Sequence, residues 1–152
     1  RQRGCHADLA LVGDGPLLPK LRRQCAGRSD IILTGTLTGE PLQQSYASSD
    51  AFVFPSTTDT FGNVVLEAQA SGLPAIVANA GGPPEIVRRH ASGIVVDPDS
   101  PGALADAMAV LCTDASLRRR LGEQALVNAR ESSWESILDL FWSGGQPAVK
   151  QS

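Results

Sequence analysis

Short apolar runs alternate with longer segments of helical pattern along most of the chain. Each apolar run ends at Gly, Pro, Asn or Asp, which is typical of buried strands. We predict strands at 7–12, 31–34, 51–54, 75–78 and 93–96. We predict helices at 17–26, 39–48, 62–71, 83–89, 101–111, 115–131 and 134–141.

Strands that are this apolar and are separated by helices predict one parallel sheet with helices on both faces. The predicted fold class is therefore α/β, a Rossmann-like doubly wound domain. The ligand of such a domain lies beyond the carboxyl ends of the strands. The loops at those ends are 13–16, 35–38, 55–60 and 79–83.

The helix at 62–71 follows a run of cap-forming side chains. With Thr60 as the N-cap, the main-chain N–H groups of residues 60–63 would be free at the positive end of the helix dipole. Gly62 has no side chain, so a phosphate could approach the backbone closely there. Gly81 and Gly82, before the next helix, could likewise admit a ligand oxygen.

Glu67 shares a helix face with Asn63 and Val64, at spacings of four and three residues. Its carboxylate could accept hydrogen bonds from two neighbouring hydroxyls, such as those of a ribose. Alternatively, Asp59 caps the helix and Glu67 is an ordinary exposed residue. The spacing alone leaves both interpretations open.

Composition narrows the possible classes of protein. The chain has 152 residues, 42% of them hydrophobic and 19% charged, as in a soluble globular domain. The net charge of −3 argues against a general nucleic-acid binder. No apolar run approaches the length of a membrane span, and no signal peptide is visible.

The remaining candidate motifs favour structural roles. Cys5, Cys25 and Cys112 are far apart, which favours reduced thiols in a cytoplasmic protein and disfavours a metal site. The pair Asp97 and Asp99 precedes a helix, so capping explains it better than a metal. Residues 118–120 are three arginines on a predicted helix. We expect them to form a solvated basic face, and attraction to anionic lipid is the alternative.

The passage PSTTDTFGNVVLEAQASGLP resembles glycosyltransferase family 4, also called glycosyl transferases group 1. Asp59 and Glu67 have seven residues between them, as in the E-x7-E signature of retaining glycosyltransferases with the GT-B fold. The words LVGDGP, TGTL, SSDAFVFPS, ANAGGPPEIV and SGIVVDP resemble that family in the same order, from about residue 7 to residue 140. One departure is the aspartate, where the signature has its first glutamate.

The resemblance implies a role for residues 1–143 as the donor-binding, C-terminal half of a GT-B enzyme, with 144–152 as a flexible tail. Such an enzyme transfers a hexose from a UDP- or GDP-sugar to an acceptor hydroxyl, with a lipid or a glycan as the candidate acceptors, and keeps the anomeric configuration. It needs no metal or other cofactor. The N-terminal domain would be absent, so we expect the isolated chain to be inactive.

The resemblance also implies the contacts of the donor. Glu67 would hold the ribose, and Asp59 would contact the sugar. The tip of the helix would hold the diphosphate and sugar hydroxyls through Phe61, Gly62, Asn63 and Val64. The loops after the first two strands would border the nucleotide and its base through Gly13, Gly15, Thr36 and Leu37.

Two other functions remain open: a sugar-nucleotide epimerase on the same fold and a nucleotide-binding or scaffolding module without chemistry. The spacing of Asp59 and Glu67 argues against the epimerase. The expected partners are the nucleotide sugar, the missing N-terminal domain and a membrane surface or lipid acceptor. The expected location is the cytoplasm, with a peripheral position at the inner membrane face as the alternative.

Overall fold

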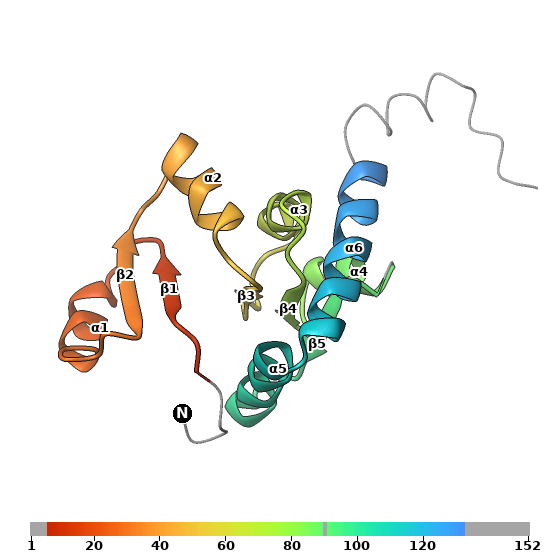
Figure 1. Ribbon diagram of the computed structural model, residues 1–152. Coiled ribbons are helices and arrows are strands. Elements are labelled where there is room, and N and C mark those ends of the chain that lie inside the picture. Colours follow the sequence, from red (N-terminus) through yellow and green to blue (C-terminus); the bar gives the residue numbers. More distant parts are fainter. Residues whose placement is uncertain (1–5, 90, 133–152) are drawn as a thin grey trace, which may run out of the picture. The chain divides into compact units, whose positions relative to one another are not determined.

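The computed structural model describes residues 6–89 and 91–132. The chain divides into two compact units, Arg1–Ser49 and Asp50–Ser152. Each unit has its own parallel sheet, and Figure 1 labels the elements of both. The single domain expected at 1–143 stays a prediction, and the expected helix at 134–141 and tail at 144–152 lie outside the described residues.

The first unit contains β1 (Leu9–Val12), α1 (Leu18–Gln24), β2 (Ile31–Gly35) and α2 (Gly39–Ala47). Leu9 pairs with Ile31, and the register shifts at the end of β1, where Val12 pairs with Gly35. The main-chain N–H of Gly13 then donates a hydrogen bond to the carbonyl oxygen of Gly35 (2.8 Å). The loops that follow β1 and β2 therefore begin side by side.

The second unit contains β3 (Phe52–Phe54), α3 (Asn63–Ala70), β4 (Ala75–Ala78), α4 (Pro83–Arg89), β5 (Gly93–Val96), α5 (Pro101–Thr113) and α6 (Ala115–Glu131). Its strands are parallel and lie in the order β3-β4-β5. β4 is in the middle, and all four of its residues are buried. The continuous apolar sequence of this strand is what burial on both faces requires.

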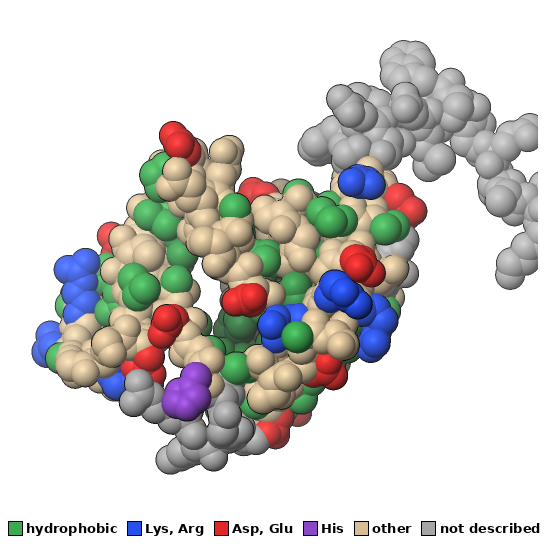
Figure 2. Space-filling view, in the orientation of Figure 1, with side chains coloured by type: hydrophobic (Ala, Val, Ile, Leu, Met, Phe, Trp, Pro, Cys, Tyr) green, Lys and Arg blue, Asp and Glu red, His purple; other side chains and the backbone are tan. Residues whose placement is uncertain are grey.

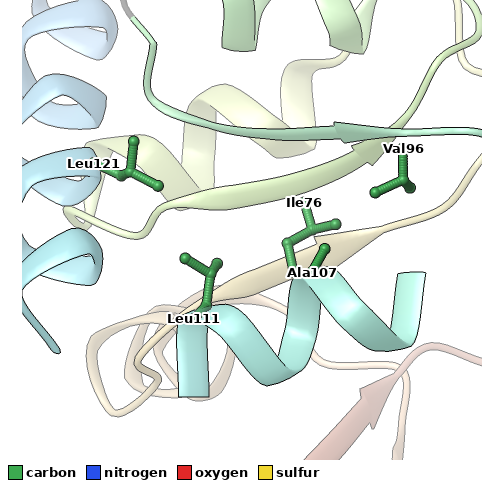
Figure 3. Close-up of a cluster of buried hydrophobic side chains, with 5 residues drawn as sticks. All are labelled: Ile76, Val96, Ala107, Leu111 and Leu121. Atoms are coloured by element: carbon green, nitrogen blue, oxygen red, sulfur yellow. The ribbon is translucent and has the colours of Figure 1, made fainter. Parts of the chain in front are cut away.

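Side chains of β4 alternate between two packed layers. Ile76 points toward α5 and α6, where it packs with a cluster of apolar side chains (Figure 3). Ala75 and Val77 point to the opposite face, where they pack with Val65 of α3 and Val87 of α4. The second unit is thus a three-layer α/β/α arrangement, as the doubly wound pattern predicts.

The α/β class and the parallel strands are confirmed, and every predicted element within the described residues is present. The bounds of β4, α4, β5 and α6 are those predicted. The pairing differs, because the strands form sheets of two and three rather than one continuous sheet. Apolar runs identify strands but carry no information on which strand lies beside which.

The described cysteines are in different states. Cys25 is a free thiol, whereas Cys112 is disulfide-bonded. The expectation of reduced thiols is therefore wrong for Cys112, because separation along a sequence does not show which thiols meet in the fold. Among residues 6–89 and 91–132, no helix combines the length and the apolar character that crossing a membrane requires.

α6 approaches the C-terminal end of α3 very closely. A Cβ atom placed on Gly122 would lie 2.5 Å from the carbonyl oxygen of Gly72, a separation that real Cβ contacts do not show. The obstacle is backbone, which cannot rotate away as a flexible side chain would. Glycine at position 122 is therefore required by the packing of α6 on α3.

We expect Gly122→Ala to lower the free energy of unfolding by roughly 1–3 kcal/mol, because the added methyl group forces the two backbones apart. This is opposite to the usual effect of this substitution in a helix, which stabilises by about 1 kcal/mol. Gly102→Ala in α5 is the matched control, since its Cβ would meet only Ser100 Oγ at 3.9 Å. Urea unfolding measures both, and equal stability of the two variants would contradict the packing argument.

Candidate functional site

The loop between β3 and α3 is closed by the side chain of Asp59. Its Oδ1 atom accepts hydrogen bonds from the main-chain N–H groups of Phe61 (2.9 Å) and Gly62 (2.5 Å). Gly62 is the N-cap of α3, in the left-handed conformation with φ 74°. The predicted N-cap, Thr60, is therefore wrong, because a left-handed residue that favours glycine ends the loop two positions later.

This geometry also corrects the expectation of free N–H groups at residues 60–63. Those of Phe61 and Gly62 are taken by Asp59. The N–H groups of Asn63 and Val64 have no acceptor among the described residues. They form the first turn of α3 and carry the positive end of its dipole. An anion at this tip would therefore meet Asn63 and Val64.

Two carboxylates, those of Glu67 and Asp59, belong to the elements that form this tip. Glu67 is exposed on α3, one turn after Asn63. Both hydrogen bonds of Asp59 go to Oδ1, and its Oδ2 atom accepts none from the described residues. A carboxylate oxygen can accept two hydrogen bonds, so Oδ2 is available to a ligand hydroxyl.

Gly81 and Gly82 bring the loop after β4 against the loop after β3. A Cβ on Gly81 would collide with the carbonyl oxygen of Asp59, and one on Gly82 with that of Thr60. The N–H of Gly82 also donates a hydrogen bond to the carbonyl oxygen of Asp59 (3.3 Å). A side chain at either position would collide with the backbone of the neighbouring loop, and the expectation that these glycines admit a ligand oxygen stays a prediction.

The sequence reasoning missed one polar pair at this end of the sheet. The guanidinium of Arg88, on α4, donates a hydrogen bond to Oδ1 of Asn79, which follows β4 (2.7 Å). Both residues are exposed. Nine positions separate them along the chain, and no pattern in the sequence indicates that a turn between β4 and α4 joins them.

The other predicted site residues belong to the first unit. Gly13 and Gly35 are paired, and the loop after β2 continues through Thr36, which is exposed, and Leu37, which is partly buried. Gly15 contributes to a shallow pocket of about 350 Å³ between the loop after β1 and α1, lined by Asp14, Gly15, Pro16, Leu18, Pro19 and Arg22. The first unit thus brings the loops of Gly13 and Thr36 together, and their predicted role at the nucleotide stays a prediction.

The aspartates at 97 and 99 form a turn. Asp97 Oδ1 accepts a hydrogen bond from the N–H of Asp99 (2.9 Å), and the cap of α5 is Ser100, whose Oγ accepts one from Ala103 N–H (3.2 Å). The expectation that this pair caps the helix is therefore wrong, because Ser100 is the capping residue and Asp97 closes a turn on Asp99 instead. Residues 6–89 and 91–132 contain no cluster of three or more metal-binding side chains. Independence from metal stays a prediction.

The arginines at 118–120 have different environments. Arg118 donates hydrogen bonds to the carbonyl oxygens of Leu111 (2.6 Å) and Cys112 (3.1 Å) near the end of α5, so it caps that helix. Arg119 and Arg120 are exposed. Figure 2 shows Lys and Arg side chains over α6 with acidic ones nearby. The solvated basic face is therefore confirmed for Arg119 and Arg120 only.

The family model for glycosyl transferases group 1 matches residues 1–114. The chain therefore belongs to the glycosyl transferases group 1 family. It is similar to sulfoquinovosyl transferase SQD2 of Arabidopsis thaliana, with 38% identity over 86% of this chain and 26% of that protein.

A second relative is GDP-mannose-dependent alpha-(1-6)-phosphatidylinositol monomannoside mannosyltransferase of Mycobacterium tuberculosis, with 37% identity over 75% of this chain and 32% of that protein. The chain thus spans about a quarter to a third of the length of these curated relatives. Among solved structures, Anabaena HepE in complex with UDP-glucose matches with a TM-score of 0.74 and 25% identity, over 86% of this chain and 38% of that one. The fold is the Rossmann-like half of a GT-B glycosyltransferase.

We expect Asp59→Ala to destabilise the chain by roughly 0.5–2 kcal/mol, because two main-chain N–H groups lose their acceptor. Asp59→Asn is the matched control, since its Oδ1 can accept the same two hydrogen bonds and stability should stay close to that of the wild type. Thermal unfolding of the three proteins measures the difference. An alanine variant as stable as the wild type would show that the cap contributes nothing.

Proposed function

We propose that this chain is the donor-binding domain of a retaining glycosyltransferase, which transfers a hexose from a nucleoside diphosphate sugar to an acceptor hydroxyl. The tip of α3 carries this proposal. It offers the open N–H groups of Asn63 and Val64, a glycine cap at Gly62 and the exposed carboxylate of Glu67 one turn further on. Membership of the glycosyl transferases group 1 family supports the same reaction class.

The diphosphate binds at the first turn of α3. Its oxygens accept hydrogen bonds from the N–H groups of Asn63 and Val64, and the helix dipole favours their negative charge. When the bond to the sugar breaks, negative charge develops on the leaving phosphate. Fixed N–H donors stabilise that charge more strongly in the transition state than in the bound donor, so this site needs no metal ion.

Asp59 and Glu67 bind the hydroxyl groups on either side of the diphosphate. Glu67 accepts hydrogen bonds from the two hydroxyls of the ribose. Asp59 holds the loop through Oδ1, and its Oδ2 accepts a hydrogen bond from the donor sugar.

The predicted nucleotide contacts of Gly13, Gly15, Thr36 and Leu37, which belong to the first unit, stay predictions. The UDP-glucose complex of HepE supports a uridine donor, and the name of the mycobacterial relative supports GDP-mannose. That name also supports a lipid acceptor at a membrane surface, on the cytoplasmic side.

We expect Glu67→Ala to weaken binding of UDP or GDP at least tenfold, because the ribose hydroxyls lose their acceptor. Calorimetric titration of the chain with each nucleotide and with its glucose or mannose conjugate measures this affinity. Glu85→Ala is the matched control, since it removes an exposed carboxylate from the neighbouring helix α4 and should leave the affinity unchanged. Equal affinities of the two variants would favour a scaffolding module over a transferase.

We expect this chain to bind the donor without transferring its sugar, because it spans only about a quarter to a third of its curated relatives and the acceptor pocket would belong to a part that it does not cover. An assay with radiolabelled UDP-glucose or GDP-mannose and a mixture of lipid and glycan acceptors measures transfer. The full-length mycobacterial mannosyltransferase is the positive control. Ordinary turnover by the 152 residues alone would overturn this part of the proposal.

A further inference from the structure

Three polar side chains form a buried hydrogen-bonded network on the inner side of α3. Gln69 of α3, Ser92 before β5 and Asn128 of α6 are each fully buried. Gln69 Nε2 donates to Ser92 Oγ (2.7 Å), and Asn128 Nδ2 donates to Gln69 Oε1 (2.6 Å). Asn128 Nδ2 also donates to the carbonyl oxygen of Ile86 in α4 (3.1 Å). The network therefore joins α3, α4 and α6.

Stability alone does not explain this network. Asn128 Oδ1 is buried and accepts no hydrogen bond from the described residues. A buried acceptor without a donor lowers the stability of the folded state, whereas apolar side chains of the same shape would avoid that loss. Hydrogen bonds are directional and apolar contacts are not. What the network adds is therefore a fixed orientation of the helices that it joins.

The orientation that it fixes is that of the candidate donor site. Gln69 lies two residues after Glu67, so the two side chains leave α3 roughly 200° apart. Holding Gln69 on the buried face therefore holds Glu67 on the exposed face. Ile86 makes a second connection, because its side chain packs at Gly62, where an added Cβ would lie 2.6 Å from Ile86 Cδ1.

We propose that Gln69, Ser92 and Asn128 are positioning residues for donor binding. They fix the rotation of α3 about its axis, and so the direction of Glu67 and of the N–H groups of Asn63 and Val64. This inference rests on the proposed function, since it concerns the same ligand site. α6 contributes no residue to that site. Through Asn128 it nevertheless influences the affinity for a nucleoside diphosphate.

The test is the double variant Gln69→Leu/Asn128→Leu in the full chain. Both partners of the Gln69–Asn128 hydrogen bond become apolar, whereas Ser92 Oγ and the carbonyl oxygen of Ile86 each lose a donor, so we expect a lower melting temperature and a protein that is still folded at the temperature of the titration. Titration with UDP and GDP should show an affinity at least tenfold weaker, because the directional contacts that fix the rotation of α3 are lost. Val127→Asn is the control, since position 127 is exposed beside Asn128 and its change should alter neither measurement.

A folded double variant with an affinity within twofold of the wild type would overturn the inference and leave the proposed function intact. A wild-type chain that binds neither nucleotide would overturn both. A second measurement covers a double variant that does not fold: hydrogen exchange of the wild type with and without nucleotide. We expect the ligand to slow exchange in α3 and also in α6 around Asn128, and slowing confined to α3 would overturn the inference.

Discussion

Burial of β4 on both faces is the constraint on which the second unit depends. A strand whose residues are all inaccessible must be covered by helices on each side, and its alternating side chains decide which helix lies where. α3 and α4 cover one face and α5 packs on the other, with α6 in contact with the α5 side as well as with α3. The position of α3, and hence of its N-terminal tip, follows from the side chains of this central strand.

Much of this arrangement could be predicted from the sequence, because the signals are local. The bounds of α4 follow from Pro83 and those of β4 from Pro74 and Asn79, each beside a clear change in hydrophobicity. The pairing of the strands and the disulfide at Cys112 could not be predicted, because both depend on contacts between distant residues. Local patterns carry no record of such contacts.

The same difference between local sequence signals and contacts of distant residues holds for the candidate site. Asp59 and Glu67 were singled out by their resemblance to the E-x7-E signature, and Gly62 by its place at the start of the predicted helix. Capping by Asp59 was one of two open interpretations, and its particular partners, the N–H groups of Phe61 and Gly62, could not be predicted because they depend on the left-handed conformation of Gly62. The buried partners of Gln69 were equally hidden, since Asn128 is 59 positions away along the chain.

The two hydrogen bonds by which Asp59 closes its own loop have a consequence for the thermodynamics of ligand binding. The loop between β3 and α3 takes its shape from its own carboxylate, so that shape exists before any ligand arrives. A ligand that meets such a preorganised loop does not have to order it, and little of the binding free energy is lost as conformational entropy. A donor that binds at the tip of α3 as proposed would therefore be selected by its fit to a preformed loop rather than by adaptation of that loop.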